Sequence, residues 1–138
     1  MKTIEVSAAI IHRGRQVLLC QRAEGTNCEL LWEFPGGKVE NGETYRECLI
    51  RECREELGIV IQPETHLCDI LYHYPEFTVN LHFYISKILK GTPSNIEHRK
   101  IHWCSMDELT AMLLCPADQK MLTENRSRIE VLLGNDES

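Results

Sequence analysis

Three glutamates crowd one face of a helix predicted over residues 43–57. Glu52, Glu55 and Glu56 stand at i, i+3 and i+4, which places them on one arc of a helical wheel, beside the apolar stripe. Like charges at these spacings destabilise a helix by about 0.2–0.5 kcal/mol per pair, and the helix dipole disfavours anions in the C-terminal half. Because this arrangement is unfavourable on its own, it predicts a bound cation.

A solvated acidic face, neutralised by Arg51 and Arg54, is the alternative interpretation of this helix. The preceding residues, Phe34-Pro35-Gly36-Gly37, favour the cation. Two consecutive glycines let the backbone approach a ligand closely, and they leave carbonyl oxygens accessible. Carboxylates and a carbonyl are hard oxygen ligands, which suit Mg²⁺ or Mn²⁺ and do not suit zinc.

The elements that must position these groups follow from the hydrophobic pattern. At the ends of the helix over 43–57, Thr44 and Glu47 fit a capping box and Gly58 suits the C-terminal cap. Apolar patterning predicts strands over 3–11, 16–21, 31–34, 68–74, 77–87 and 100–104, and further helices over 106–114 and 119–133. Strands mixed with a few helices indicate an α+β protein in which helices pack on a sheet.

Length and composition suit one globular domain over residues 1–138, with 43% hydrophobic residues. No apolar run is long enough to cross a bilayer and the first five residues lack the apolar core of an export signal, so we expect a cytoplasmic protein without a membrane partner. The net charge of −6 and the lack of a basic stripe argue against polymeric nucleic acid as a partner. A phosphate-bearing substrate would need a cation near so acidic a chain.

The cysteines and histidines form no recognisable site in the sequence. The seven cysteines are odd in number and contain no CxxC pair, so neither disulfides nor zinc are expected and most are interpreted as buried apolar residues. Five of the six histidines are scattered without metal-site spacing, at His66, His73, His82, His98 and His102.

One long motif resembles a known family. Gly37, then five residues, Glu43, then seven residues, and Arg51-Glu52-Cys53-Arg54-Glu55-Glu56-Leu57-Gly58-Ile59 resemble the Nudix box, here residues 37–59. Cys53 stands where the family usually has an aliphatic residue. The helical wheel places Cys53 on the core face, so this departure changes the packing and not the acidic face. The segments Gln21-Arg22-Ala23 and 32–40 resemble the MutT branch, and Cys115-Pro116-Ala117-Asp118 resembles its CTP and 5-hydroxy-dCTP pyrophosphohydrolases. The likeness runs from Ile4 to about Leu122.

The resemblance implies a Nudix fold, an α/β/α sandwich with a mixed sheet between helices. It implies Mg²⁺-dependent hydrolysis, with Mn²⁺ able to substitute, of nucleoside triphosphates to a nucleoside monophosphate and pyrophosphate. The implied metal ligands are the carboxylates of Glu52, Glu55, Glu56 and Glu97 and the main-chain carbonyl of Gly36. Glu52 is the expected general base, and Arg51 is expected to anchor Glu43 or the acidic cluster, with a surface ion pair as the alternative.

Six residues are candidates for substrate contacts. Arg22 is expected to hold a phosphate unless it is simply solvated, and Glu33 is expected to touch the sugar. Phe77, with Tyr72 and Tyr74, would stack on the base, or these rings fill a sheet face. An ionised Asp118 would accept hydrogen bonds from amino-bearing bases and disfavour uracil, unless it caps the last helix. We therefore expect cytosine nucleotides or oxidised purines to lead, in a role that cleanses the nucleotide pool.

Two other functions remain open at this point. The first is a Nudix hydrolase of another diphosphate, such as ADP-ribose or a dinucleoside polyphosphate, which the short chain and the segment at Asp118 disfavour. The second is a non-catalytic Nudix module that senses a nucleotide, which the complete set of box glutamates disfavours. A monomer and a dimer are both compatible with the sequence.

Overall fold

One mixed seven-stranded β-sheet forms within residues 2–134, the part of the chain that this computed structural model describes. The strands pair in the order β3-β2-β1-β6-β5, with β4 beside β1 and β7 beside β2. β1 and β6 run parallel, whereas the pairs on either side of them run antiparallel. The strands are β1 Thr3–Arg13, β2 Gln16–Gln21, β3 Trp32–Glu33, β4 Gly36–Lys38, β5 Val60–His73, β6 Thr78–Lys90 and β7 Lys100–Ser105.

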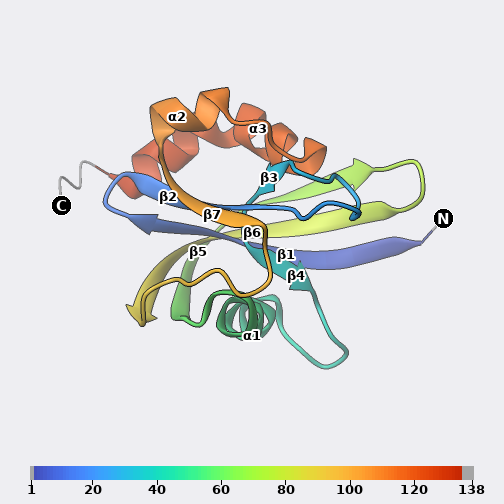
Figure 1. The fold of residues 1–138 in the computed structure, drawn as a ribbon, viewed down its shortest axis with the longest axis horizontal. Coiled ribbons are helices and arrows are strands. Elements are labelled where there is room, and N and C mark those ends of the chain that lie inside the picture. Colours follow the sequence, from blue (N-terminus) through green and yellow to red (C-terminus); the bar gives the residue numbers. More distant parts are fainter. Residues whose placement is uncertain (1, 135–138) are drawn as a thin grey trace.

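Helices cover both faces of this sheet (Figure 1). α1 (Tyr45–Leu57) packs on one face, while α2 (Met106–Ala111) and α3 (Pro116–Leu133) lie across the other. Successive side chains of a strand point to opposite faces, so the strands contribute side chains to two apolar cores, one on each face of the sheet. One core gathers around Phe83 and Met121 on the α3 side, and the other gathers around Leu49 and Leu57 under α1. The predicted mixed sheet between helices is confirmed.

Both predicted caps of α1 are confirmed, which fixes the helix that carries the acidic face. The Glu47 amide donates to the Thr44 hydroxyl at 3.1 Å, and the Thr44 amide donates to the Glu47 carboxylate at 2.9 Å. Gly58 ends the helix at φ 69°, a left-handed conformation that favours glycine. The helix begins at Tyr45, slightly later than predicted, because Thr44 is the cap itself.

The remaining boundaries differ from the predictions for identifiable reasons. α3 begins at Pro116 and not at residue 119, since proline fits the first helical position, where no amide hydrogen is needed. β5 begins at Val60 and not at residue 68. Its polar start and Pro63 resemble a loop, but β5 ends the sheet order and Pro63 adjoins a register shift, where proline is tolerated. Strand β4 was not predicted, because only its pairing with β1 makes the glycines a strand.

Other whole-chain expectations meet the structure as follows. The seven cysteines all fall within residues 2–134 and are free thiols, and five of them are buried. In the same range, no helix has both the length and the apolar character needed to span a bilayer. The ends of the predicted domain, residue 1 and residues 135–138, lie outside the described residues.

Candidate active site

Strand β4 supports the acidic face of α1 with bare backbone. Gly36 and Gly37 pair with Ala8 and Ser7 of β1. A Cβ atom at Gly36 would lie 1.9 Å from the Ser7 carbonyl oxygen, and one at Gly37 would lie 2.4 Å from the carboxylate carbon of Glu52. Such contacts are far inside van der Waals distance. Gly36 is therefore needed for strand pairing, and Gly37 is needed for Glu52 to rest against the strand.

Arg51 joins the carboxylates of the site into one network. Its Nε donates to Glu43 at 2.6 Å, and its Nη1 donates to Glu52 at 2.8 Å and to Glu55 at 3.3 Å. A further bond runs from Nη2 to the Lys38 carbonyl of β4. These bonds raise the pKa of Arg51, and the bond from Arg51 lowers the pKa of Glu43, so both groups stay ionised. Arg51 thus occupies the expected anchoring position, while catalytic roles of Arg51 and Glu43 stay predictions.

Glu56 is the most buried of the three helix glutamates, with 13% of its side chain exposed. Among the described residues, its Oε1 atom has no hydrogen-bond partner. Burial, reinforced by the charge of Glu52, raises the pKa of Glu56 to about 9, and burial also raises the pKa of Glu52. A buried anion without a partner is costly, so this point favours either a proton or a bound cation.

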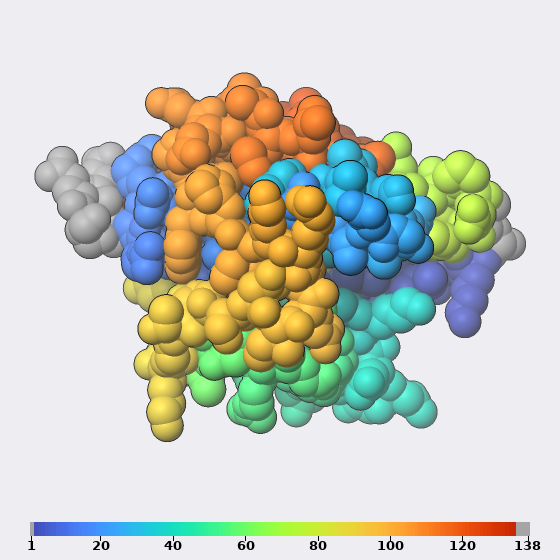
Figure 2. Space-filling model, in the orientation of Figure 1, coloured from blue at the N-terminus to red at the C-terminus, as the bar shows by residue number. Residues whose placement is uncertain are grey.

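The segment 91–99 brings another carboxylate to the C-terminal end of α1. The Ser94 amide donates to the Leu57 carbonyl at 2.9 Å, and the Ile96 amide donates to the Glu56 carbonyl at 3.3 Å. Figure 2 shows the segment, yellow to orange, lying against α1, drawn in green. The next residue, Glu97, is exposed, and its charge contributes to the raised pKa of Glu56. Glu97 therefore lies near the cluster, as its expected ligand role requires.

These carboxylates fit a divalent metal ion. A hard cation would give the unpartnered Glu56 oxygen a ligand bond, and it would offset the repulsion between Glu52 and Glu56. The groups that could hold the ion are those that the sequence singles out: Glu52, Glu55, Glu56, Glu97 and the carbonyl of Gly36. The structure brings these residues to the contact between α1, β4 and the segment 91–99, and the ligand role of each one stays a prediction.

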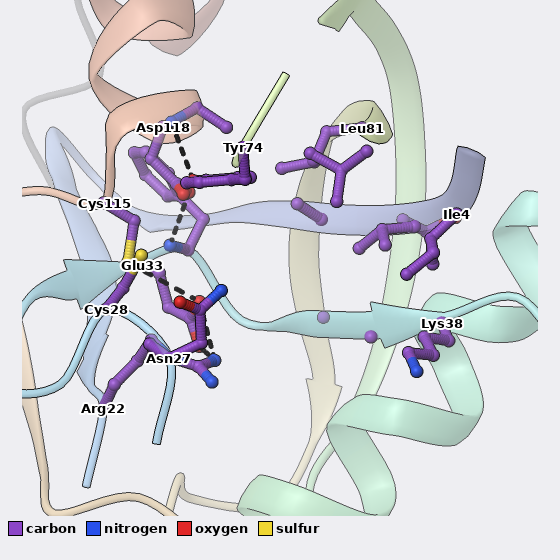
Figure 3. A pocket seen from close by; sticks show the side chains of 18 of the residues that line it. Ile4, Arg22, Asn27, Cys28, Glu33, Lys38, Tyr74, Leu81, Cys115 and Asp118 are labelled. Carbon is purple, nitrogen blue, oxygen red and sulfur yellow. Dashed lines mark hydrogen bonds and ion pairs between the residues drawn. The ribbon is translucent and has the colours of Figure 1, made fainter. Parts of the chain in front are cut away.

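A pocket of about 400 Å³ shares strand β4 with the acidic cluster. Gly36 and Gly37 line it, so the strand that supports Glu52 also forms part of the pocket wall. Figure 3 shows Lys38 at one end of this pocket and Asp118, Tyr74 and Cys115 at the other. The volume suits a small-molecule ligand. A ligand seated there could extend along β4 toward the carboxylates.

An ion pair and a histidine connect the pocket with the acidic cluster. Arg22 and Glu33 lie 3.2 Å apart in the pocket wall, and burial raises the pKa of Glu33 although Arg22 opposes the effect. His98 Nε2 lies 3.9 Å from a Glu33 oxygen and 4.0 Å from Glu56 Oε1. Burial lowers the pKa of His98, which keeps it neutral. The sequence did not single out His98, because nothing in its spacing ties it to either glutamate.

Asp118 lies in the pocket, and the alternative role considered for it is wrong. It is not the cap of the last helix, since Cys115 holds that position and Asp118 sits in the first turn of α3. Asp118 is 4% exposed, and its Oδ1 accepts a hydrogen bond from the Phe34 amide at 3.1 Å. Burial, with the charge of Glu33 nearby, raises the pKa of Asp118 well above its ordinary value. Burial therefore favours the protonated form of this carboxyl, which can donate as well as accept, whereas the sequence expectation assumed the ionised, acceptor-only form; its role in base recognition stays a prediction.

Aromatic rings line the same pocket. Phe77 and Tyr74 are lining residues with ring centroids 5.4 Å apart, and Tyr72 packs against Tyr74 at 4.7 Å. The Tyr74 hydroxyl accepts a hydrogen bond from the Ala117 amide at 3.2 Å, which fixes that ring next to Asp118. Phe77 and Tyr74 are therefore placed where they could contact a base, and Tyr72 supports Tyr74 from the side.

Sequence comparisons agree with this geometry. The family model described as NUDIX domain matches residues 1–124. The chain is 40% identical over 122 residues to the CTP pyrophosphohydrolase of Escherichia coli, an alignment that covers 88% of this chain and 90% of that protein. It is 35% identical over 122 residues to the 8-oxo-dGTP diphosphatase of Haemophilus influenzae, with the same coverage of 88% and 90%.

Solved structures show the same architecture. The solution structure of the E. coli ORF135 protein superimposes with a TM-score of 0.78 at 38% identity, over 93% of this chain and 94% of that one. The MutT protein from Methanosarcina mazei gives a TM-score of 0.81 at 25% identity, over 92% and 94%. With the box glutamates gathered on α1 beside a glycine strand and a family model that spans most of its length, this chain belongs to the Nudix hydrolase family.

Proposed function

We propose that this Nudix hydrolase splits nucleoside triphosphates into a nucleoside monophosphate and pyrophosphate, with Mg²⁺ as its ion and Mn²⁺ as a substitute. The observation that carries the proposal is the shared strand: Gly36 and Gly37 both line a pocket of about 400 Å³, and Gly37 also lies against the carboxylate of Glu52. A base held in the pocket would direct its phosphates along β4 toward the glutamates. The similar proteins named above act on CTP and on 8-oxo-dGTP, as their names state.

Glu52 and Arg51 have separate roles in the proposed reaction. Water attacks a phosphorus, by our proposal the β-phosphorus, and the bond to the oxygen shared with the α-phosphorus breaks. Glu52 accepts the proton of the water, and burial raises the pKa of its carboxyl, which makes the carboxylate a stronger base. Arg51, 2.8 Å from Glu52, holds that carboxylate in place. When bound, a divalent ion supplies charge that offsets the triphosphate and lowers the pKa of water.

Arg22 and Glu33 are proposed to bind the part of the substrate that lies between the base and the phosphates next to the acidic cluster. Arg22 carries a planar guanidinium that can hold a phosphate through two parallel bonds. It already pairs with Glu33 and with the Asn27 carbonyl, so it is held in the pocket wall before a ligand arrives. Glu33 is proposed to meet the sugar, and Phe77 is proposed to stack on the base.

We propose cytosine nucleotides or oxidised and otherwise modified nucleotides as the substrates, in cleansing of the nucleotide pool. Asp118 is buried in the pocket, which raises the pKa of its carboxyl, and the protonated form that burial favours offers a donor and an acceptor, which matches the amino group and the ring nitrogen of cytosine. The 40% sequence identity to a CTP pyrophosphohydrolase also supports cytosine as the base. A site built on such bonds rejects analogues that leave its buried groups unpaired.

A substrate panel tests the proposal. kcat/KM is measured with Mg²⁺ for CTP, dCTP, 5-hydroxy-dCTP, dGTP, 8-oxo-dGTP and dUTP, with ADP-ribose and a dinucleoside polyphosphate alongside, and phosphate and pyrophosphate are counted separately. We expect pyrophosphate release, with a cytosine nucleotide or an oxidised purine first and dUTP last. The Glu52→Gln variant should lose several orders of magnitude in kcat while Glu124→Gln, an exposed glutamate of α3, keeps it.

Each alternative corresponds to a distinct result of the same panel. Preference for ADP-ribose or a dinucleoside polyphosphate would replace the triphosphate substrate. Tight nucleotide binding without turnover in Mg²⁺ would assign the chain to the nucleotide-sensing modules. Retained activity in Glu52→Gln would remove Glu52 from the mechanism.

A further inference from the structure

A second group of metal-ligating side chains lies on the α1 face of the sheet, outside the acidic cluster and the pocket. Asp69 Oδ1 lies 2.6 Å from His66 Nε2 and 2.7 Å from His82 Nδ1. The three side chains each offer one ligand atom, and these atoms lie within 4.8 Å of one another. The histidines have no metal-site spacing in the sequence, since two strands supply this group.

A β-bulge in β5 brings His66 and Asp69 to the same face. Residues three apart in a regular strand point to opposite faces. The register of β5 against β6 shifts between His66 and Cys68, so His66 lies opposite Tyr84 and Asp69 lies directly opposite His82. A bulge adds a residue to one strand and redirects the side chains on either side of it. Here it makes an i, i+3 pair converge on one buried histidine.

His82 is the fixed member of the group. Its side chain is 5% exposed, and the Tyr45 ring at the start of α1 stacks on its imidazole with centroids 3.7 Å apart. Its second ring nitrogen, Nε2, lies 2.7 Å from Glu5 Oε1. A ligating histidine usually donates its other N–H to a carboxylate, which sets the tautomer and the ring orientation. Glu5 therefore occupies the position that would direct Nδ1 of His82 toward a metal ion.

We propose that His66, His82 and Asp69 bind a divalent transition ion of the zinc class. Two imidazoles and one carboxylate suit Zn²⁺ or Co²⁺, whereas Mg²⁺ prefers oxygen ligands. Ligand bonds of about 2.0–2.1 Å in a tetrahedron separate the ligand atoms by about 3.3 Å. The atoms now 2.6–2.7 Å apart would therefore spread by several tenths of an ångström.

The two side chains that must move to admit the ion are the exposed ones. His66 and Asp69 are each nearly half exposed, so they can open around the ion while His82 stays in place. Their exposure also leaves room for water as a fourth ligand, as in open zinc sites. The ion binds only when His66 Nε2 and His82 Nδ1 carry no proton, and any proton displaced from these nitrogens passes to solvent.

A charged hydrogen-bond network is the competing account of the same contacts. If both nitrogens of His82 carry protons, the ring donates to Asp69 and to Glu5 and needs no ion. The two accounts differ in what happens when zinc is offered: the network has no reason to bind it, and the proposed site binds one ion.

The test is metal binding to chelator-treated protein in excess Mg²⁺, which keeps the active-site glutamates occupied. Zn²⁺ is titrated by calorimetry, and Co²⁺ is titrated by its visible absorption, which reports tetrahedral coordination. We expect one ion per chain. We expect His66→Ala and Asp69→Asn, both at exposed positions, to abolish the tight site without unfolding the protein. His102→Ala is the matched control, because His102 is an exposed histidine that also pairs with a single carboxylate, Glu108, at 3.2 Å.

Two further variants separate this site from its surroundings. Glu5→Gln should weaken zinc binding about 10- to 100-fold without removing it, as loss of a ligand's hydrogen-bond partner does. Glu56→Gln should leave the single Zn²⁺ ion bound, since the site contains no box glutamate. No tight zinc binding by the wild-type chain would overturn the proposal. So would zinc that survives both His66→Ala and Asp69→Asn, or zinc that disappears in Glu56→Gln.

Discussion

Gly37→Ala should damage catalysis without unfolding the protein. A Cβ atom added at Gly37 would lie 2.4 Å from the carboxylate carbon of Glu52 and 2.5 and 2.7 Å from its two oxygens. The neighbour is the free end of a side chain and not backbone, so the carboxylate can move away. Since ordinary contact begins near 3.4 Å, Glu52 must shift by about 1 Å, and its 2.8 Å bond from Arg51 is strained or lost.

The size of the expected effect follows from that shift. A misplacement of about 1 Å in an active site can cost about 100-fold in rate, which corresponds to about 2.7 kcal/mol of activation free energy. Gly37 does not have a positive φ, so alanine adds no left-handed strain to the backbone. We therefore expect kcat to fall about 100-fold while the thermal midpoint changes little.

The assay is pyrophosphate release at saturating substrate and Mg²⁺, read beside thermal unfolding of the same samples. Gly25→Ala is the control: its φ is +79° and a Cβ there meets nothing within 4 Å, so alanine costs about 1 kcal/mol of backbone strain and leaves Glu52 in place. We expect this control to lose stability and keep kcat. A folded Gly37→Ala protein with wild-type kcat would refute the placement of Glu52 against β4.

Two more predictions concern stability. Gly36→Ala puts a Cβ 1.9 Å from the Ser7 carbonyl oxygen, an atom of the backbone that cannot swing away, so β4 must separate from β1 and the midpoint of denaturant unfolding should fall well below that of Gly37→Ala. For the metal-free protein, the folded state holds a proton on Glu56 up to a pKa of about 9, whereas the unfolded chain releases it near 4.5. The folded state therefore binds more protons across this window, so the free energy of unfolding should fall as pH rises from 4.5 to 9, by at most about 1.4 kcal/mol per pH unit. Urea unfolding at several pH values checks this; Glu56→Gln should flatten the slope, and an equal slope in that variant would contradict the assignment.

Local sequence rules predicted the helix that carries the acidic face. Thr44 and Glu47 form the expected capping box, and Gly58 closes the helix in the left-handed conformation. These contacts join residues a few positions apart, so their spacing alone specifies them. For the same reason, helical periodicity was enough to place the three glutamates on one face of α1 and Cys53 in the core.

Contacts between segments that are far apart in the sequence could not be predicted from local spacing. The glycines of β4 became a strand only by pairing with β1, and His98 reached Glu33 and Glu56 only because the segment 91–99 folds over the end of α1. The raised pKa of Asp118 results from its burial beside Glu33, which no local pattern encodes.

The amino-acid sequence by itself determined the acidic helix face, its caps and the family, because all of these depend on residue type and short spacing. Tertiary structure alone decided which strand supports Glu52, how the pocket joins the acidic cluster, and that a bulge in β5 turns Asp69 toward His82. Side chains from separate strands meet through register and burial, and these are properties of the assembled sheet.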